Sequence, residues 1–307
     1  MLKEQIARAV GPSAIDLAYE ERGDPAYPTV LLVMGLAAQL VHWREGFLDA
    51  LVERRLHVVR FDNRDSGCST HLRSAPPADL PAALAGDLSS VTYTLSDMAN
   101  DAVGLLDALH VGAAHVVGAS MGGAIAQTLA LEHPRRVLSL TSMLSTTGGA
   151  DVGQIHPETL QAVFGGPRAR TRDEVVARAV RSCQIVGSPT YPDDLEAVAE
   201  RARIAFDRDY DEAAIARQAV ATVASGDRTP RLRTLELPTL VVHGLADTLC
   251  DPSGGRAVAA AIPGAELILI EGMGHDLPRP LWSTFADAIA ANVRRGEARA
   301  ARRLPAS

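Results

Sequence analysis

Cysteines, aromatic residues and long apolar stretches are all scarce in this sequence of 307 residues. Its three cysteines, Cys68, Cys183 and Cys250, lie far apart and form no Cys-x-x-Cys pair, which argues against a disulfide framework and against a zinc site. No uncharged apolar stretch reaches the roughly 18 residues of a membrane-spanning helix, and the N-terminal region lacks the apolar segment of a secretory signal. We therefore expect a soluble, cytoplasmic protein that binds no metal.

Positive charge is also scarce. The 30 Lys and Arg residues are outnumbered by 37 Asp and Glu residues, which gives a net charge of −7. Such a chain lacks the broad positive field that attracts nucleic acids or anionic lipids, so we expect neither nucleic acid nor a membrane as a partner. Arginines do cluster from Arg294 onward. This cluster could be a basic interaction tail, but we favour the interpretation that it is the frayed end of a helix.

What the sequence does contain is an alternation of short apolar segments, rich in β-branched residues, with segments of helical periodicity. This alternation predicts a parallel sheet covered by helices. The predicted strands are an edge strand near Ile15–Tyr19 and Thr29–Val33, His57–Phe61, His115–Val117, Val137–Met143, Thr239–His243 and Glu266–Ile270. The predicted helices are Trp43–Arg54, one that starts with a Thr94 and Asp97 capping box, Met121–Glu132, Gly254–Ala261 and Leu281–Arg295.

One region interrupts the alternation. Residues 151–229 are rich in charged residues, show helical spacing and contain no clear strand. We interpret them as a helical cap inserted into an α/β core, which residues 1–150 and 230–307 then form. Turn-forming segments at the two ends of the insertion, Thr146–Gly149 and Gly226–Pro230, mark its boundaries.

A Gly-x-Ser-x-Gly motif lies at the end of one predicted strand. It runs from Gly118 to Gly122, directly after Val117 and at the start of the helix that begins at Met121. In so tight a turn the positions flanking the serine must be nearly free of side chains, so that the hydroxyl of Ser120 is presented above the sheet. The motif alone is weak evidence, but its place between a strand and a helix predicts a nucleophilic serine.

A serine hydroxyl needs a base and an orienting acid, which in this arrangement follow the serine in the order acid, then histidine, in loops at the C-terminal ends of strands. His275 is the one histidine beyond Asp247, and it follows the last predicted strand in a loop whose glycines let it fold back toward the sheet. Asp247, in the loop after the strand Thr239–His243, is the favoured acid. The alternatives are Asp251, which resembles a helix N-cap, and Asp151.

Two backbone N–H groups are also needed, to bind the oxyanion that forms on an attacked carbonyl group. We expect the first from Met121, whose place at a helix N-terminus also favours negative charge. The second is expected in the loop after Val33, where Gly35 permits a turn. Leu36 is the favoured donor in this loop, and Ala37 is the alternative.

These motifs together resemble the α/β-hydrolase superfamily. They are Val33–Leu36 with Trp43 following, Arg60–Thr70, Gly118–Gly122, Pro238–Asp247 and Gly272–His275. The resemblance spans nearly the whole chain except the insertion, and it implies a mostly parallel, eight-stranded sheet flanked by helices, with a helical cap. Within the superfamily the chain is similar to the group of the aclacinomycin methylesterases and related small carboxylesterases. It departs from many members at Met34, where they have a histidine.

The resemblance implies that Asp62, Arg64 and Asp65 brace the top of the sheet rather than bind a charged substrate. A pocket for an apolar substrate is expected under the cap, although the aromatic residues of the insertion are equally able to pack its own interior. The candidate pocket residues are Gly35, Met143, Phe164, Tyr191, Phe206 and Tyr210.

We expect a monomeric or homodimeric serine hydrolase that cleaves a small to medium, largely apolar carboxylic ester, a methyl ester included, through an acyl-enzyme and without a cofactor. Ser120 would attack, His275 would transfer the proton and Asp247 would orient the imidazole. Lactone, thioester or C–C bond hydrolysis, acyl transfer and perhydrolysis use the same triad and stay open as alternatives. A non-catalytic ligand receptor on the same fold is a further alternative.

Overall fold

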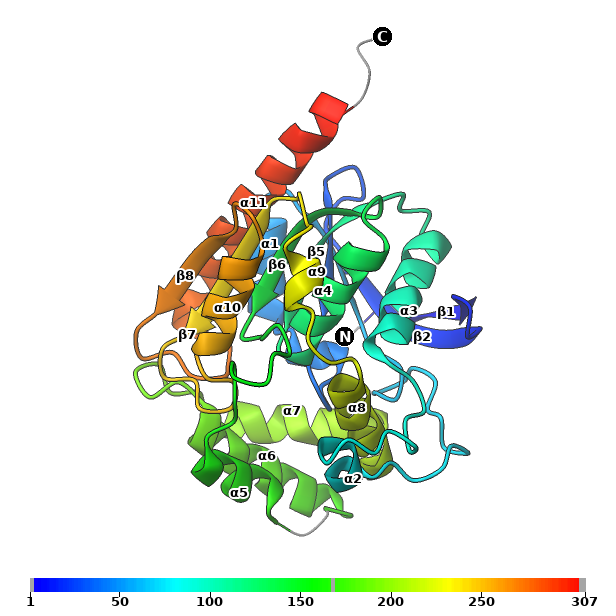
Figure 1. The fold of residues 1–307 in the computed structure, drawn as a ribbon, viewed down its shortest axis with the longest axis vertical. Helices are drawn as coiled ribbons and strands as arrows, with labels where there is room; N and C mark the ends of the chain where they lie inside the picture. The colour runs from blue at the N-terminus through cyan, green and yellow to red at the C-terminus, as the bar shows by residue number, and fades with distance from the viewer. Residues whose placement is uncertain (1–2, 167–168, 304–307) are drawn as a thin grey trace.

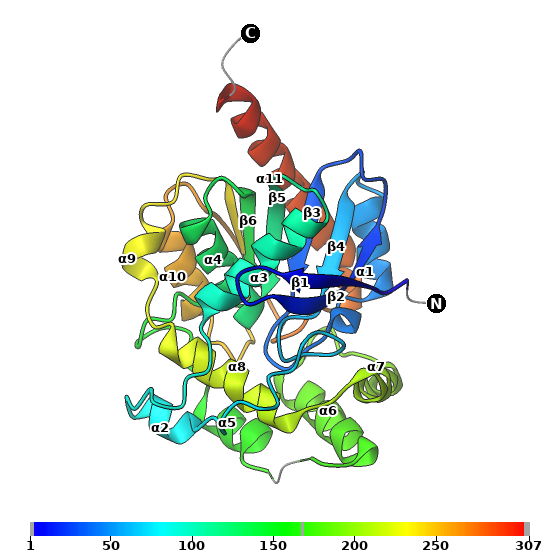
Figure 2. The ribbon, with the colours of Figure 1, turned by 90° about the vertical axis from the view of Figure 1, so that its right-hand side faces the viewer.

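The computed structural model describes residues 3–166 and 169–303 (Figures 1 and 2). In these residues eight strands form one sheet in the order β1-β2-β4-β3-β5-β6-β7-β8. β1 pairs antiparallel with β2, and β2 with β4, whereas all other neighbours are parallel. The predicted mostly parallel, eight-stranded sheet is thereby confirmed. The strands are β1 (Gln5–Val10), β2 (Ile15–Arg22), β3 (Thr29–Val33), β4 (His57–Phe61), β5 (Ala114–Ala119), β6 (Val137–Met143), β7 (Thr239–Gly244) and β8 (Glu266–Ile270).

Helices cover both faces of the sheet, and strand residues alternate between the two faces. In β3, Val30 and Leu32 belong to one apolar cluster, and Leu31 and Val33 belong to the other. The helices of the first face are α1 (Glu45–Val52) and α11 (Trp282–Arg303), and those of the second are α3 (Leu95–Ala108), α4 (Met121–Glu132) and α10 (Ser253–Ala261). Because both faces are buried, the central strands are apolar along their whole length.

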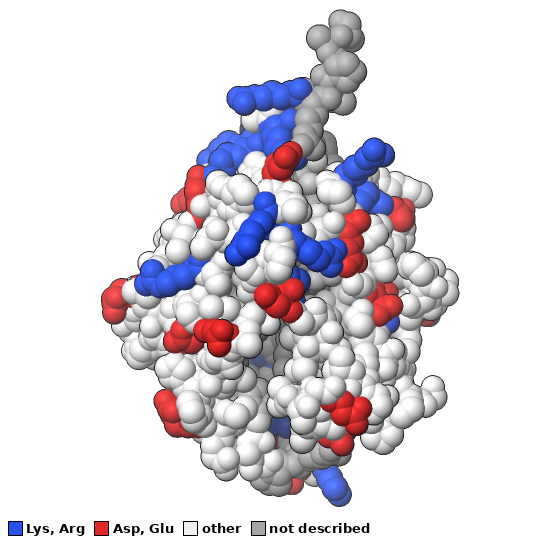
Figure 3. Space-filling view, in the orientation of Figure 1, with Lys and Arg blue, Asp and Glu red and all other residues white. Residues whose placement is uncertain are grey.

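A layer of helices lies across the end of the sheet where the parallel strands end (Figure 1). It consists of α5 (Pro157–Phe164), α6 (Arg172–Val186), α7 (Leu195–Arg208) and α8 (Glu212–Ala224), all between β6 and β7. We call it the α5–α8 layer; its helices fall within the predicted insertion. The space-filling view is hollowed where this layer meets the core (Figure 3). The short helices are α2 (Leu80–Leu84), which lies against α8, α9 (Thr229–Leu232), η1 (Leu40–His42) and η2 (Arg279–Leu281).

Three elements differ from the sequence prediction. β2, which was expected at the edge of the sheet, lies between β1 and β4, and β1 is the edge strand. β1 was not predicted because only Ala7 and Val10 of this strand are buried, so that no alternating pattern marks it. α11 continues to Arg303 instead of fraying after Arg295, and it projects beyond the body of the molecule (Figure 2). Its Ala and Arg residues favour helix, and Glu297 lies 2.9 Å from His115 in the sheet. The other predicted strands and helices are present with small shifts at their ends, and the predicted capping box starts α3.

Among the helices in the described ranges, none combines the length with the apolar character that crossing a membrane requires.

Candidate active site

Ser120 lies at the turn between β5 and α4. Its backbone has φ 56° and ψ −123°, a strained conformation for a residue with a side chain. The flanking glycines make this turn sterically feasible, because a Cβ on Gly118 would collide with the Gly122 carbonyl oxygen, and a Cβ on Gly122 with the Val33 carbonyl oxygen. The sharp turn that presents Ser120 at the C-terminal end of β5 therefore requires glycine at both positions.

The side chains of Ser120, His275 and Asp247 form a continuous chain of hydrogen bonds. Ser120 Oγ lies 3.0 Å from His275 Nε2, and His275 Nδ1 lies 2.7 Å from Asp247 Oδ2. The geometry fits a neutral imidazole that carries its proton on Nδ1 and accepts the serine proton at Nε2. The three residues come from the turn after β5, the loop after β7 and the loop after β8. These parallel strands end at the same edge of the sheet, with β6 between β5 and β7.

Asp247 is almost completely buried, with 1% of its surface exposed. Its Oδ1 accepts hydrogen bonds from the N–H groups of Leu249 (2.9 Å) and Cys250 (2.8 Å), and His243 Nε2 lies 3.3 Å from its Oδ2. Burial by itself would raise the pKa of Asp247, but His275 and these donors outweigh burial and hold the pKa well below its usual range. The carboxylate therefore stays ionised and can stabilise a positive charge on the imidazole.

The pKa of His275 shifts in the opposite direction. Burial disfavours the charged imidazolium, but the carboxylate of Asp247 outweighs this effect and raises the pKa of His275 above its ordinary value of 6.5. The histidine is thereby made a stronger base.

The His275 loop is anchored to the end of α6 and to the segment that follows it. The N–H of His275 donates to the Val186 carbonyl oxygen (2.7 Å), and the N–H of Gly274 donates to Ser188 Oγ (2.9 Å). A Cβ on Gly274 would collide with the Val186 carbonyl oxygen, and one on Gly272 would collide with Thr190. The glycines of this loop therefore permit close contact with the α5–α8 layer, whereas the sequence suggested that they let the loop fold toward the sheet.

The expected oxyanion donors lie in the backbone on either side of Ser120, at the start of α4 and in the loop after β3. Met121 is the first residue of α4, so no preceding turn of the helix supplies a carbonyl oxygen for its N–H. Gly35 packs closely on the serine, since a Cβ on it would lie 3.0 Å from Ser120 Cβ. Of the two candidates that follow, Ala37 donates its N–H to Gln218 Oε1 (3.0 Å), which leaves Leu36 as the candidate donor in this loop.

The alternative acids lie apart from the imidazole. Asp251 accepts a hydrogen bond from the Ser253 N–H (2.9 Å) and lies 3.3 Å from His156. The N-cap of α10 is the next residue, Pro252, so the expected capping position was wrong by one residue. Asp151 is exposed. In the described residues neither carboxylate is hydrogen bonded to His275.

The aromatic candidates for the pocket divide into two groups. Phe206 and Tyr210 stack on each other with ring centroids 5.6 Å apart, and Arg178 and Glu212 bind the Tyr210 hydroxyl, so that these contacts all lie inside the α5–α8 layer. This favours the alternative that they pack the interior of the layer. Of the other two aromatic candidates, Phe164 is 48% exposed and Tyr191 is partly buried against the core. The aliphatic candidate Met143 is completely buried in the core.

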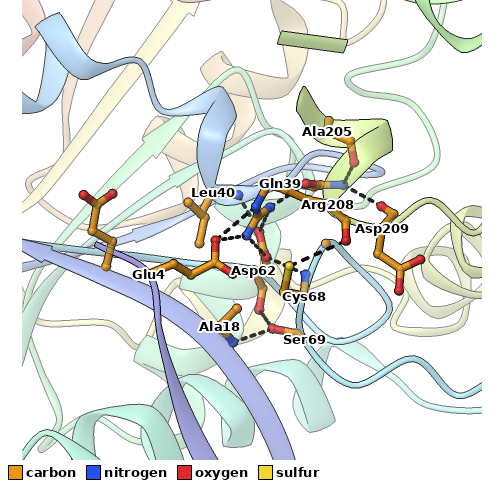
Figure 4. Close-up of polar contacts among 12 residues, drawn as sticks. Glu4, Ala18, Gln39, Leu40, Asp62, Cys68, Ser69, Ala205, Arg208 and Asp209 are labelled. Carbon is orange, nitrogen blue, oxygen red and sulfur yellow. Dashed lines mark hydrogen bonds and ion pairs between the residues drawn. The ribbon is translucent and has the colours of Figure 1, made fainter. Parts of the chain in front are cut away.

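Ion pairs join the core to the α5–α8 layer on the β2–β4 side of the site. Asp62, fully buried, binds Arg208 of α7 at 2.7 Å, and Figure 4 shows Arg208 reaching between Asp62 and Glu4. Asp65 accepts two hydrogen bonds of 2.8 Å from Arg217 of α8. Asp62 and Asp65 thus bind side chains of this protein, in agreement with the structural role expected for them.

One group of residues in the described ranges has ligand atoms close enough to hold a cation. They belong to Asp65, His71 and Asp211, and all lie within 4.8 Å of one another. However, the guanidinium of Arg217 binds both carboxylates, at 2.8 Å from Asp65 and 3.1 Å from Asp211. The arginine already supplies the positive charge that a metal ion would bring.

Other residues that support the site were given no role from the sequence. Asn63 donates to the Met34 carbonyl oxygen at 2.9 Å, and Ser188 and Gln218 make the contacts described above. Their partners lie 29, 86 and 181 positions away along the chain. No local motif reveals contacts of this kind, because they form only after folding.

Comparisons with known proteins agree with this architecture. A family model described as alpha/beta hydrolase fold matches residues 28–278. The rhodomycin D methylesterase of Streptomyces peucetius is 30% identical over 94% of this chain and 98% of its own length, and that of Streptomyces sp. strain C5 is 29% identical over 94% and 98%. A hydrolase of Pseudomonas aeruginosa has a solved structure that aligns with a TM-score of 0.70 at 26% identity, over 96% of this chain and 98% of that one.

These matches extend over the core and the α5–α8 layer alike. They confirm the predicted fold class, the predicted hydrolase class of enzyme and the predicted similarity to methylesterases of this fold. The chain belongs to the family of enzymes with the α/β-hydrolase fold.

Proposed function

We propose that this protein hydrolyses a small to medium, largely apolar carboxylic ester through an acyl-enzyme on Ser120. The observation that carries the proposal is the unbroken chain of hydrogen bonds from Ser120 Oγ through His275 to Asp247. The relatives named rhodomycin D methylesterase support a methyl ester as the first class of substrate to examine.

The proposed reaction follows from the hydrogen bonds that link Ser120, His275 and Asp247. His275 Nε2 takes the proton of Ser120 as Oγ bonds to the ester carbonyl carbon, and the N–H groups of Leu36 and Met121 bind the resulting oxyanion. The intermediate collapses when the imidazolium returns this proton to the leaving alcohol, which leaves an acyl group on Ser120. A water molecule then attacks the acyl carbonyl carbon while His275 takes its proton. The bond to Ser120 Oγ breaks as the imidazolium returns this proton to the serine, and the acid is released. Asp247 stays ionised and holds the imidazole throughout.

The test combines turnover with covalent labelling. The purified protein is assayed on a short-chain p-nitrophenyl ester and on methyl esters, and it is treated in parallel with a fluorophosphonate whose attachment site is mapped by mass spectrometry. We expect turnover together with a single adduct on Ser120. Labelling without turnover of any ester would favour the ligand receptor, and the absence of both would refute the proposal.

The α5–α8 layer supports a limit on substrate size. It lies over the edge of the sheet that carries Ser120, and it contacts the His275 loop at Val186 and Ser188. If the layer acts as a cap, kcat/KM should be highest for short and medium acyl chains and should fall toward long ones. A series of p-nitrophenyl esters with acyl chains of about two to sixteen carbons tests this expectation. A maximum at the longest chains would contradict an enclosed site.

The pH dependence should report the titration of His275. Only the neutral imidazole accepts the serine proton, so kcat/KM falls as the pH drops through the pKa of this histidine. Because Asp247 raises that pKa, we expect the inflection on the acid side above about 6.5, with activity approaching a plateau at higher pH. A profile that is flat between about pH 5 and 8 would argue against a histidine base.

A further inference from the structure

The loop after β3 is held by residues of the α5–α8 layer. This loop, Met34–Gln39, contains the proposed donor Leu36. Ala37 N–H donates to Gln218 Oε1 of α8 at 3.0 Å, and Gln39 Nε2 donates to the carbonyl oxygen of Ala205, near the end of α7, at 2.8 Å. Figure 4 shows Gln39 extending toward Ala205 and Arg208. Two separate side chains thus tie the loop to the layer.

The backbone of the loop requires such support. The N–H of Ala38 donates to the Gly35 carbonyl oxygen at 3.3 Å, which closes a turn with Ala37 at its third position. Ala37 has a φ of 61°, in the left-handed region that Gly and Asn tolerate far better than Ala. An ordinary φ becomes accessible if the peptide between Leu36 and Ala37 rotates. That rotation would turn the Ala37 N–H away from Gln218, and the Leu36 carbonyl group with it, and so would change the ψ of Leu36, the residue that carries the proposed donor N–H.

Gln218 is itself firmly placed. Its side chain is completely buried, and its Nε2 donates to the Arg64 carbonyl oxygen at 2.9 Å. The neighbouring Arg217 binds both oxygens of Asp65 at 2.8 Å, which fixes this turn of α8 on the loop after β4. Both polar ends of the amide therefore have partners, and the acceptor end is directed at the strained turn.

We propose that Gln218 is a positioning residue that holds the Leu36 N–H in the orientation needed to bind the oxyanion. The inference rests on the proposed ester hydrolysis and adds to it a residue that never contacts the reacting atoms. Because Gln218 belongs to α8 and Leu36 to the core, the oxyanion site is complete only while α8 is docked on the core. Binding of the transition state therefore depends on the contact between the α5–α8 layer and the core.

The principal variant is Gln218→Met, which keeps the length of the side chain and removes both hydrogen bonds. We expect kcat to fall about ten- to a hundredfold, less than the loss of a whole oxyanion donor, while KM changes by no more than about twofold. Thr222→Val is the matched control, because it removes the hydrogen bond from Thr222 Oγ1 to the Gln218 carbonyl oxygen, also in α8, and leaves the loop contact intact. The control should keep kcat within about twofold of the wild type.

Two ketone inhibitors separate positioning from a general structural effect. A trifluoromethyl ketone adds to Ser120 and places an oxyanion in the site, whereas the matching methyl ketone binds largely as the ground state. Gln218→Met should weaken the first inhibitor by the same factor as kcat and leave the second unchanged. Gln218→Glu keeps an acceptor oxygen for the Ala37 N–H and should recover most of both losses. If Gln218→Met fails to fold, Gln218→Asn, which shortens the amide by one methylene group, takes its place with the same expectation.

The inference is overturned if Gln218→Met, or Gln218→Asn in its place, matches Thr222→Val in kcat and in trifluoromethyl ketone affinity, or if that variant weakens both ketones equally. A wild-type protein with neither ester turnover nor fluorophosphonate labelling would instead refute the proposed function, which is a different and separately recognisable result.

Discussion

Replacement of Ser120 by alanine is expected to lower kcat by a factor of roughly 10⁴ or more. The reaction loses its nucleophile, and no other hydroxyl is placed 3.0 Å from His275 Nε2 in the described residues. The fold should survive because alanine keeps the Cβ and the backbone strain at this position is unchanged. Initial rates on a p-nitrophenyl ester, together with thermal unfolding of both proteins, measure the effect.

Ser139 offers a matched control for this change. It is a buried serine whose Oγ also lies close to a histidine, 2.9 Å from His115 Nδ1, but it lies near the start of β6, away from the C-terminal edge of the sheet. Ser139→Ala should lose about 1 kcal/mol of stability and keep its activity. Nearly normal activity in Ser120→Ala would exclude this serine as the nucleophile.

Replacement of Asp247 by asparagine is expected to lower kcat by a factor of roughly 10³ to 10⁴. The amide can still accept hydrogen bonds from Leu249 and Cys250, so the loop should keep its shape. It can, however, present an N–H group to His275 Nδ1, which favours the wrong tautomer, and it carries no charge to stabilise the imidazolium. Steady-state kinetics of the purified variant on the same ester test this.

Two further measurements make this experiment specific to the acid. Asp251→Asn removes a carboxylate of the same loop that binds Ser253 and His156, and it should cost less than about tenfold in kcat. The pH at which activity falls on the acid side should also be lower for Asp247→Asn than for the wild type. The reason is that the variant lacks the carboxylate that raises the pKa of His275. If Asp251→Asn lost more of its kcat than Asp247→Asn, Asp251 would be the acid that orients His275.

Much of the fold is determined by short-range patterns. The apolar segments that became β3, β4, β6, β7 and β8 are marked by their β-branched residues, and the start of α3 by its Thr94 and Asp97 capping box. The three side chains of the candidate site follow from order and position alone. Ser120 stands in a strand-to-helix turn, and Asp247 and His275 follow strands that must end at the same edge of a parallel sheet. The structure brings these side chains within hydrogen-bond distance.

Contacts between segments that are distant in the sequence could not be predicted, because they depend on where those segments meet after folding. β1 pairs with β2 although its own sequence shows no strand pattern, because backbone hydrogen bonds to a neighbour need no apolar alternation. The pairing of Asp62 with Arg208 and of Ala37 with Gln218 joins positions 146 and 181 residues apart. A glutamine or an arginine in an amphipathic helix carries no local mark of its partner, since the side-chain period fixes only the face of the helix on which it lies. The candidate reacting groups could thus be predicted from local patterns, whereas the packing of α7 and α8 on the core sets what holds the backbone around them.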